Sequence, residues 1–351
     1  MMRTIRLIFT LALICSLLAC SQNYDSNTPE QQRNLLLFGT IINITLYGVD
    51  EAHANQAFKL LDRDFTRWHQ NWSPWTDGEL AQLNLKLSAG TSFKVDPELR
   101  DLIQTGAHLS AISNNLFNPA IGNLVNLWQF HRADEADIKP PSPAAIAKVI
   151  NAKPSMADLV IHGNTISSTN PAVQLTLGAY AKGYAIEIAL ARLRAMGIQD
   201  AVINAGGDLK VIGKHGKRDW RVGIRHPRQP GTLGWINARP EEGIFTSGDY
   251  ERFYMYKGKR MHHILDPRTG YPSTGLTSVT VIDNSASLAD AAATAMMVAG
   301  PEHWYATAKA MGIKYAMVVD ENGHIELNPA MAKRVHFNTD QSANISLSQP
   351  L

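Results

Sequence analysis

Residues 262–270, HHILDPRTG, place imidazole, carboxylate, guanidinium and hydroxyl groups in one strand-to-turn segment. A structural turn needs little more than Pro and Gly, so the other groups indicate chemistry. Further along, Asp290 and Thr294 stand four residues apart in an alanine-rich stretch, and a helix there puts both on one face. Their oxygens suit a hard cation such as Mg²⁺, and Arg and His nearby suit a phosphorylated ligand. A salt bridge of Asp290, or a Thr294 hydroxyl bonded to its own helix, explains the same pair without a metal.

Outward from this stretch, helical and strand patterns alternate along the chain without a regular βαβ order. The sequence therefore predicts the α+β class, with mixed or antiparallel sheets, flanking helices and two subdomains. The expected helices are 51–69, 79–87, 97–113, 124–130, 183–196 and 287–299. The expected strands are 41–46, 173–177, 201–204, 220–225, 234–238, 243–246 and 315–319, together with strand material over 252–265 that contains a hairpin turn at 257–259.

The N-terminus carries a processing signal. Arg3 and Arg6 precede an apolar run, and small-residue cleavage before Cys20 resembles a bacterial lipoprotein signal, with a secretory signal or a membrane anchor as alternatives. We expect a signal peptide over 1–19, lipidation of Cys20, a tether over 20–34, one catalytic domain over 35–337 and a polar tail over 338–351. Removal of Cys15 with the signal leaves no free thiol, which suits an oxidising compartment outside the cytoplasm.

The overall charge gives no reason to expect a nucleic acid partner. The chain has 33 basic and 31 acidic residues, a formal net charge of +2, and no basic cluster with interleaved aromatics.

Three further glycine-containing motifs could hold a phosphate. Residues 178–183, GAYAKG, join an expected strand to a helix start, where free N–H groups and Lys182 favour an anion. Residues 206–208, GGD, allow close backbone approach, but by themselves they favour a tight turn over a site. Residues 246–249, TSGD, could line a phosphate or the approach of a nucleophile, and they are equally compatible with an ordinary glycine turn. His262 and His263 are adjacent on an expected strand and so point to opposite faces, which leaves one of them available as a general base.

Taken together and in this order, the motifs resemble the ApbE family of FAD:protein FMN transferases. Its blocks match residues 38–40 (FGT), 117–119 (FNP), 178–184 (GAYAKGY), 204–208 (NAGGD), 246–250 (TSGDY), 263–270 (HILDPRTG) and 288–294 (LADAAAT). The resemblance implies a Mg²⁺-dependent enzyme that splits FAD, attaches FMN to a Thr or Ser of a target protein and releases AMP. It also implies targets in membrane redox complexes, of the sodium-pumping NADH:quinone reductase or Rnf type, and a lipid-anchored enzyme in the periplasm.

Carried over by position, the resemblance implies roles for individual residues. The metal ligands would be Asp290, Thr294 and the backbone carbonyl of Ala179. The FAD-contacting residues would be Lys182, Phe38, Phe117, Ile264, Arg268 and one of the tryptophans, for which we take Trp75. Asn118 and Thr176 stand at FAD-site positions where the family usually has Asp, and Phe38 replaces a usual Met.

The incoming hydroxyl needs a base. His263 ranks first because the pKa of an imidazole lies near the working pH, and Asp249 and Asp266 are the other candidates. Two other functions use the same groups: a pyrophosphatase that releases FMN and AMP, and a protein that binds FAD without chemistry.

Overall fold

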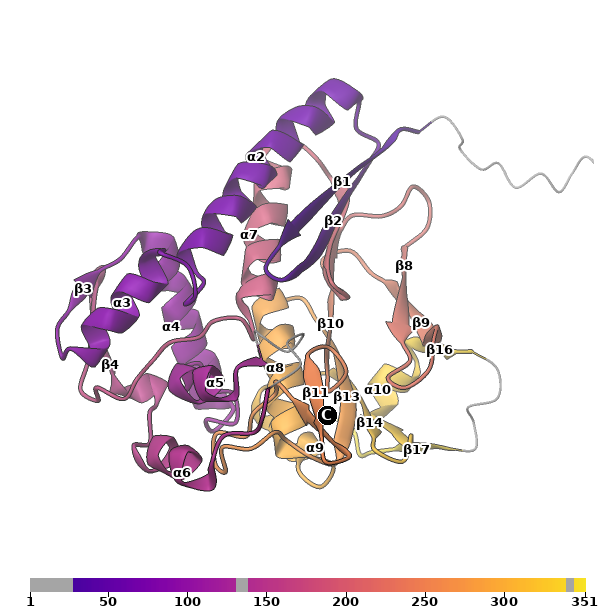
Figure 1. Cartoon of the computed structure of the whole chain (residues 1–351). Coiled ribbons are helices and arrows are strands. Elements are labelled where there is room, and N and C mark those ends of the chain that lie inside the picture. Colours follow the sequence, from indigo (N-terminus) through magenta and orange to yellow (C-terminus); the bar gives the residue numbers. More distant parts are fainter. Residues whose placement is uncertain (1–27, 131–137, 339–343) are drawn as a thin grey trace, which may run out of the picture.

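A nine-stranded sheet runs through the molecule (Figure 1). The computed structural model describes residues 28–130, 138–338 and 344–351. Neighbouring strands are antiparallel except for the parallel outer pair β15 and β17. In order across the sheet the strands are β1 (Glu30–Leu37), β2 (Thr40–Tyr47), β6 (Asp200–Ala205), β7 (Asp208–Ile212), β10 (Gly243–Gly248), β13 (Leu276–Asp283), β14 (Tyr315–Asp320), β15 (Ile325–Leu327) and β17 (Ile345–Leu347).

Helices cover one face of this sheet. The helices α2 (Glu51–Asn71), α7 (Ala181–Ala195) and α8 (Ala286–Ala299) contact the sheet, and α8 also contacts α4 (Pro97–Ile112) and α9 (Trp304–Ala310). The alternation of β2 puts Ile42, Ile44 and Leu46 into the large apolar core beneath these helices. A three-stranded sheet of β16 (Val335–Phe337), β9 (Thr232–Ala238) and β8 (Trp220–Arg225) belongs to a second apolar cluster with residues of the other face.

The remaining elements extend the molecule at its edges. They are α3 (Glu79–Ser88), β3 (Phe93–Lys94), α5 (Gly122–Trp128), α6 (Pro143–Asn151), η2 (Met156–Asp158), β4 (Leu159–His162), β5 (Thr165–Ser168), the hairpin β11 (Phe253–Tyr256) and β12 (Lys259–His262), and α10 (Pro329–Ala332). The α+β class predicted from the sequence is confirmed, with a mixed sheet and flanking helices.

Three boundaries predicted from the sequence are wrong. The tether was expected to reach residue 34, but β1 begins at Glu30, so the ordered domain starts earlier. The expected polar tail contributes β17 to the main sheet. The extended segment 173–177 is not a ladder strand, because its sole bridge within residues 28–130, 138–338 and 344–351 is an isolated one from Gln174 to Ile121.

The signal peptide and Cys20 lie outside the described residues. Within the described part of the chain, no helix combines the length and the apolar character needed to cross a membrane.

Helices α7 and α8 cross closely at Gly183. A Cβ atom on Gly183 would lie 2.5 Å from the backbone oxygen of Ala286, so the two helix backbones would have to separate. We expect Gly183→Ala to lower the free energy of unfolding by about 2 kcal/mol, because overpacking at a backbone contact outweighs the better helix propensity of Ala. Urea denaturation measures the free energy of unfolding of the variant and of the wild-type chain. Gly178→Ala is the matched control, since a Cβ there meets no atom within 4 Å, and equal stability of the two variants would contradict the close crossing.

Candidate functional site

The site forms where the first turn of α7 meets α8 and the start of β7. Residues 178–180 make a turn in which the Leu177 carbonyl accepts the N–H groups of Tyr180 and Ala181. Helix α7 then begins at Ala181 without a side-chain cap from Tyr180. The Gly183 N–H donates instead to Oδ2 of Asp290 on α8, at 3.1 Å. The helix start predicted from the sequence is therefore joined to the carboxylate predicted to bind a metal.

Lys182 lies between two carboxylates. Its Nζ is 2.7 Å from Oδ2 of Asp208 and 3.9 Å from Oδ1 of Asp290. We call these three residues the lysine–aspartate cluster. Asp208, at the first position of β7, also accepts the Thr246 N–H at 3.0 Å. Both carboxylates are buried, and Lys182 is partly buried.

The pKa values of Lys182 and Asp290 reflect their burial and their mutual proximity. Burial disfavours the charged lysine, but Asp208 and Asp290 outweigh it and raise the pKa of Lys182. Burial raises the pKa of Asp290, with Lys182 acting in the opposite direction. A further cation beside Asp290 would favour its ionised form.

The oxygens around Asp290 have the character of a site for a hard cation. Among the residues that the structure describes, Oδ1 of Asp290 has only the 3.9 Å contact to Lys182, which is longer than a hydrogen bond. Thr294, one turn later on α8, has its hydroxyl 3.2 Å from that of Ser247 on β10. Ala179 lies in the exposed turn before α7. In the described part of the chain no three His, Cys, Asp or Glu side chains group as metal ligands, so a metal here would need hydroxyl and backbone oxygens.

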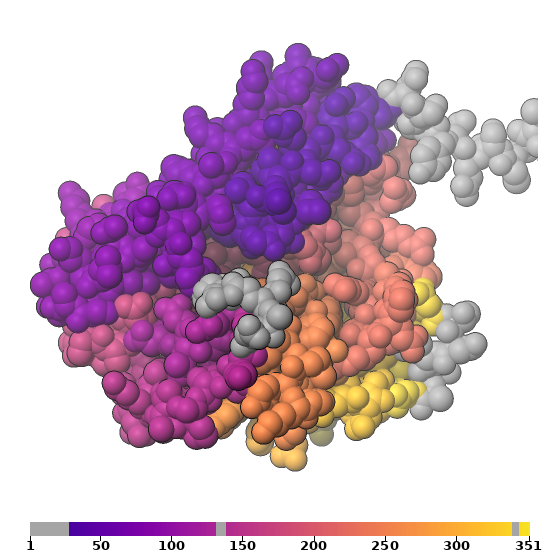
Figure 2. Space-filling model, viewed as in Figure 1, coloured from indigo at the N-terminus to yellow at the C-terminus, as the bar shows by residue number. Residues whose placement is uncertain are grey.

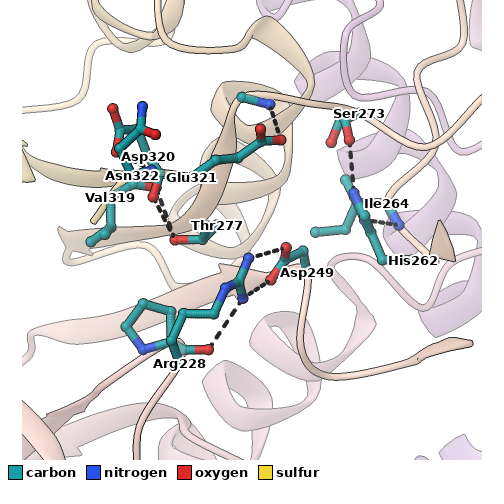
Figure 3. A network of polar contacts seen from close by, with 12 residues as sticks. Arg228, Asp249, His262, Ile264, Ser273, Thr277, Val319, Asp320, Glu321 and Asn322 are labelled. Atoms are coloured by element: carbon teal, nitrogen blue, oxygen red, sulfur yellow. Dashed lines mark hydrogen bonds and ion pairs between the residues drawn. The ribbon is translucent and has the colours of Figure 1, made fainter. Parts of the chain in front are cut away.

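The two histidines take different roles, as their alternation predicted. His262 ends β12 and is buried, with Nε2 donating to the Ser273 carbonyl at 2.8 Å and Nδ1 3.4 Å from the Ile264 N–H (Figure 3). His263 follows the strand, and its buried Nδ1 has no hydrogen-bond partner among residues 28–130, 138–338 and 344–351. Burial, followed by the nearby charges of Arg252, His262 and Lys182, holds the pKa of His263 well below its ordinary value. The ring is therefore neutral before the reaction, and it is a weaker base than the ordinary imidazole assumed when His263 was ranked first.

The two carboxylates considered as alternative bases are held by arginines. Asp249 accepts both terminal nitrogens of Arg228, at 2.7 and 2.6 Å, as Figure 3 shows. Asp266 accepts Nε and a terminal nitrogen of Arg268, at 2.9 and 2.8 Å. Bidentate pairs of this kind occupy both carboxylate oxygens with arginine N–H groups. His263 differs from both carboxylates in that its buried Nδ1 has no hydrogen-bond partner in the described part of the chain.

The Arg268 side chain pairs with Asp266 and does not contact the lysine–aspartate cluster among the described residues. Its guanidinium also donates to the Val298 carbonyl at 3.1 Å, so it fastens the 266–270 turn to the end of α8. It lines two surface cavities of about 530 and 370 Å³, and neither is lined by a member of the lysine–aspartate cluster. A direct contact of Arg268 with a phosphate at that cluster has no support in this arrangement.

The aromatic residues differ in what they offer to a ligand. Phe38 lies at the tip of the β1–β2 hairpin and packs on Phe65, His69 and Trp72. Trp75 is 45% exposed, and its indole N–H donates to Asn126.

Phe117 and Ile264 are only 2% and 5% exposed. Phe117 packs edge-on against Tyr180, immediately before α7. It therefore supports the 178–180 turn from within the core and offers little surface to a flavin.

Asn118 and Thr176 have local roles. The Asn118 amide donates to the Pro154 carbonyl, and its Oδ1 accepts the Ala120 N–H. The Thr176 N–H donates to the Pro119 carbonyl. Both residues position the segment that leads to Gly178, and no side-chain contact joins them to the lysine–aspartate cluster within the described ranges.

Two residues of the site escaped the sequence reasoning. Asp208 was interpreted as part of a tight turn, yet it is the nearest partner of Lys182. Arg228 lies in a loop with no motif, yet it forms an ion pair with Asp249. The position of Asp208 directly after two glycines was the sequence signal that could have indicated a site residue. The sequence around Arg228 contains no signal that indicates its pairing with Asp249.

Comparison with known proteins identifies the family of the chain. The model of the ApbE family matches residues 38–317. The chain belongs to the ApbE family. It is 45% identical over 307 residues to the FAD:protein FMN transferase of Rhodobacter capsulatus, covering 88% of this chain and 58% of that protein. It is also 32% identical over 248 residues to the FAD:protein FMN transferase of Vibrio cholerae, covering 69% of this chain and 73% of that protein.

Solved ApbE structures share the fold. The ApbE protein of Thermotoga maritima superposes with a TM-score of 0.80 at 27% identity, covering 88% of this chain and all of that one. The flavinyl transferase ApbE of Pseudomonas stutzeri, in its apo form, gives a TM-score of 0.77 at 28% identity, covering 88% and 97% of the two chains.

Proposed function

We propose that this ApbE-family chain splits FAD at its pyrophosphate, transfers FMN to a Thr or Ser hydroxyl of a target protein and releases AMP. The observation that carries the proposal is the lysine–aspartate cluster at the start of α7. A cation and a helix start together suit a pyrophosphate. The cluster lies in a chain whose 45% identical relative is named for this reaction.

The oxygens beside the lysine–aspartate cluster suit Mg²⁺, with Asp290, Thr294 and the Ala179 carbonyl as its protein ligands. When bound, Mg²⁺ would neutralise charge on the pyrophosphate and on the departing AMP. Lys182 is held cationic by its two carboxylates and can bind phosphate oxygens that the metal does not reach. Asp208 fixes the position of Lys182.

His263 supplies the base in this proposal. The hydroxyl oxygen of the target forms a bond to the phosphorus of the FMN half, and the bond from that phosphorus to the AMP oxygen breaks. The hydroxyl proton passes to the neutral imidazole of His263, and AMP leaves with the bonding electrons. The lowered pKa of His263 keeps the ring free of a proton before the reaction.

We further propose that the mature chain is lipid-anchored through Cys20 at a periplasmic membrane surface, and that its targets are subunits of membrane redox complexes of the NADH:quinone reductase or Rnf type. The lipoprotein-like signal and the family resemblance support both points. Palmitate labelling of cells that express the wild-type chain or Cys20→Ala tests the anchor. Equal labelling of the two would contradict it.

The reaction is tested with purified chain, FAD, MgCl₂ and a flavin-free Rnf-type acceptor subunit, followed by mass spectrometry of the acceptor. We expect the acceptor to gain one FMN on a Thr or Ser, with release of AMP, and to gain none when EDTA removes the metal. FMN and AMP formed without the acceptor would identify a pyrophosphatase instead. FAD that stays bound and intact would identify a binding protein.

A further inference from the structure

In the described part of the chain, strand β1 is an open edge of the main sheet. Among the described residues its only neighbour is β2. Leu37 of β1 pairs with Thr40 of β2, so a two-residue turn joins the strands. Phe38 and Gly39 in that turn have φ of 55° and 71°, as a type I′ hairpin requires. In such a hairpin the residues that flank the turn bond to each other, and the pairing alternates along the strand. The N–H and C=O groups of Leu36 therefore point away from β2, toward the open edge.

The half of β1 nearest the turn lacks the protection that edge strands usually carry. Residues 30–34, EQQRN, are polar, and charged or polar side chains there discourage pairing with another chain. Residues 35–37 are all leucine. Leu36 is 80% exposed, and its cross-strand partner Ile41 is 60% exposed. The two form an apolar pair beside unpaired backbone groups, which suits an added strand.

Ile41 of this apolar pair adjoins the turn that leads into Asp208 of the candidate site. The carbonyl of Ile41 accepts the N–H of Gly206 at 3.2 Å, and Gly206 and Gly207 are exposed turn residues directly before Asp208. On the helix side of the same hairpin, Phe38 contacts Trp72, and Trp72 contacts Tyr184 in the first turns of α7. Figure 2 shows the indigo N-terminal segment, which includes β1, on the face toward the viewer, with the surface receding beside it toward fainter segments.

We infer that the second half of β1, with Leu36 and Ile41, is the docking surface for the acceptor segment of the protein substrate. The inference rests on the proposed function, because a transferase to protein must hold an extended segment with its hydroxyl at the site. Main-chain bonds to the open edge at Leu36 fix the direction of that segment. An apolar side chain of the acceptor covers Leu36 and Ile41, and the bare glycine turn lets the segment continue toward Lys182.

The test compares the double variant Leu36→Ser/Ile41→Ser with the control Leu85→Ser. Leu85 is a leucine of α3 with 63% exposure and no part in the site. Transfer of FMN to the flavin-free Rnf-type subunit is measured over a range of acceptor concentrations, and FAD affinity is measured separately by quenching of flavin fluorescence. We expect the double variant to raise KM for the acceptor about tenfold or more, because two central apolar contacts are lost. FAD affinity and the transition temperature should match those of Leu85→Ser.

Each other result overturns the inference. An unchanged KM for the acceptor would show that the protein substrate docks elsewhere. A weakened FAD affinity would make Leu36 and Ile41 part of the flavin site instead. If the wild-type chain forms FMN and AMP but never modifies the acceptor, the proposed transferase function fails first, and the docking surface has no substrate to serve.

Discussion

Asp290→Asn is expected to reduce kcat/KM for FMN transfer by about 100-fold or more, because it removes the one charged oxygen donor of the proposed metal site. The substitution is close to isosteric. In the wild-type chain the Gly183 N–H donates to Oδ2 of Asp290 at 3.1 Å, and the amide oxygen of Asn can accept the same N–H. Lys182 retains its ion pair with Asp208, at 2.7 Å. Burial already opposes the charge of Asp290. We therefore expect the free energy of unfolding to change by about 1 kcal/mol or less.

Steady-state transfer assays and isothermal titration with Mg²⁺ in the presence of FAD measure the two effects. Asp200→Asn is the matched control. Asp200 is the first residue of β6, and its carboxylate accepts the Lys214 N–H. Asp200 has no role in the site, so Asp200→Asn should transfer FMN at the wild-type rate. Normal transfer and normal Mg²⁺ affinity in Asp290→Asn would remove the metal site from α8. A loss of transfer that accompanied unfolding would instead make Asp290 a structural residue.

Most of the secondary structure could be predicted because apolar periodicity directly reflects burial. Strand β14 was expected over 315–319 and spans Tyr315–Asp320, and helix α8 was expected over 287–299 and spans Ala286–Ala299. Residues 173–177 show where the rule fails. Val173, Leu175 and Leu177 are fully buried and alternate, as in a strand. However, the Asn84 side chain satisfies both backbone groups of Leu175, so no neighbouring strand is needed. A side-chain partner 91 residues away leaves no periodic signal.

The candidate site could be predicted only in part, for a related reason. Lys182 and Asp290 stand in motifs whose residue types already suggest a phosphate and a cation. Their contact through the Gly183 N–H depends on the crossing of α7 and α8, which sequence does not specify. Asp249 and Asp266 were chosen as candidate bases by residue type alone. Their arginine partners give them a different role: Arg268 is only two residues from Asp266, but Arg228 lies 21 residues from Asp249.

His263→Ala is expected to reduce the rate of FMN transfer by about 100-fold or more, with FAD affinity unchanged, because the variant loses a proton acceptor and no ligand of the flavin. The matched control is His162→Ala, an exposed histidine of β4 in a different sheet. Single-turnover transfer with FAD and the acceptor subunit in excess measures the chemical step. Wild-type transfer by His263→Ala would assign the base role to Asp249 or Asp266, although arginines hold both.

The pH profile separates a base from a merely structural His263. The groups that face it, Arg252, His262 and Lys182, act with burial to lower its pKa, so protonation requires a pH below the ordinary value of about 6.5. The base form is the unprotonated ring. Wild-type transfer should therefore stay near its maximum as pH falls from 8 to about 6.5, and decline only at lower pH as the ring gains a proton. In His263→Ala this acidic decline should disappear from the residual rate, because the titrating group is gone. A structural histidine would change the rate at every pH and leave the shape of the profile intact.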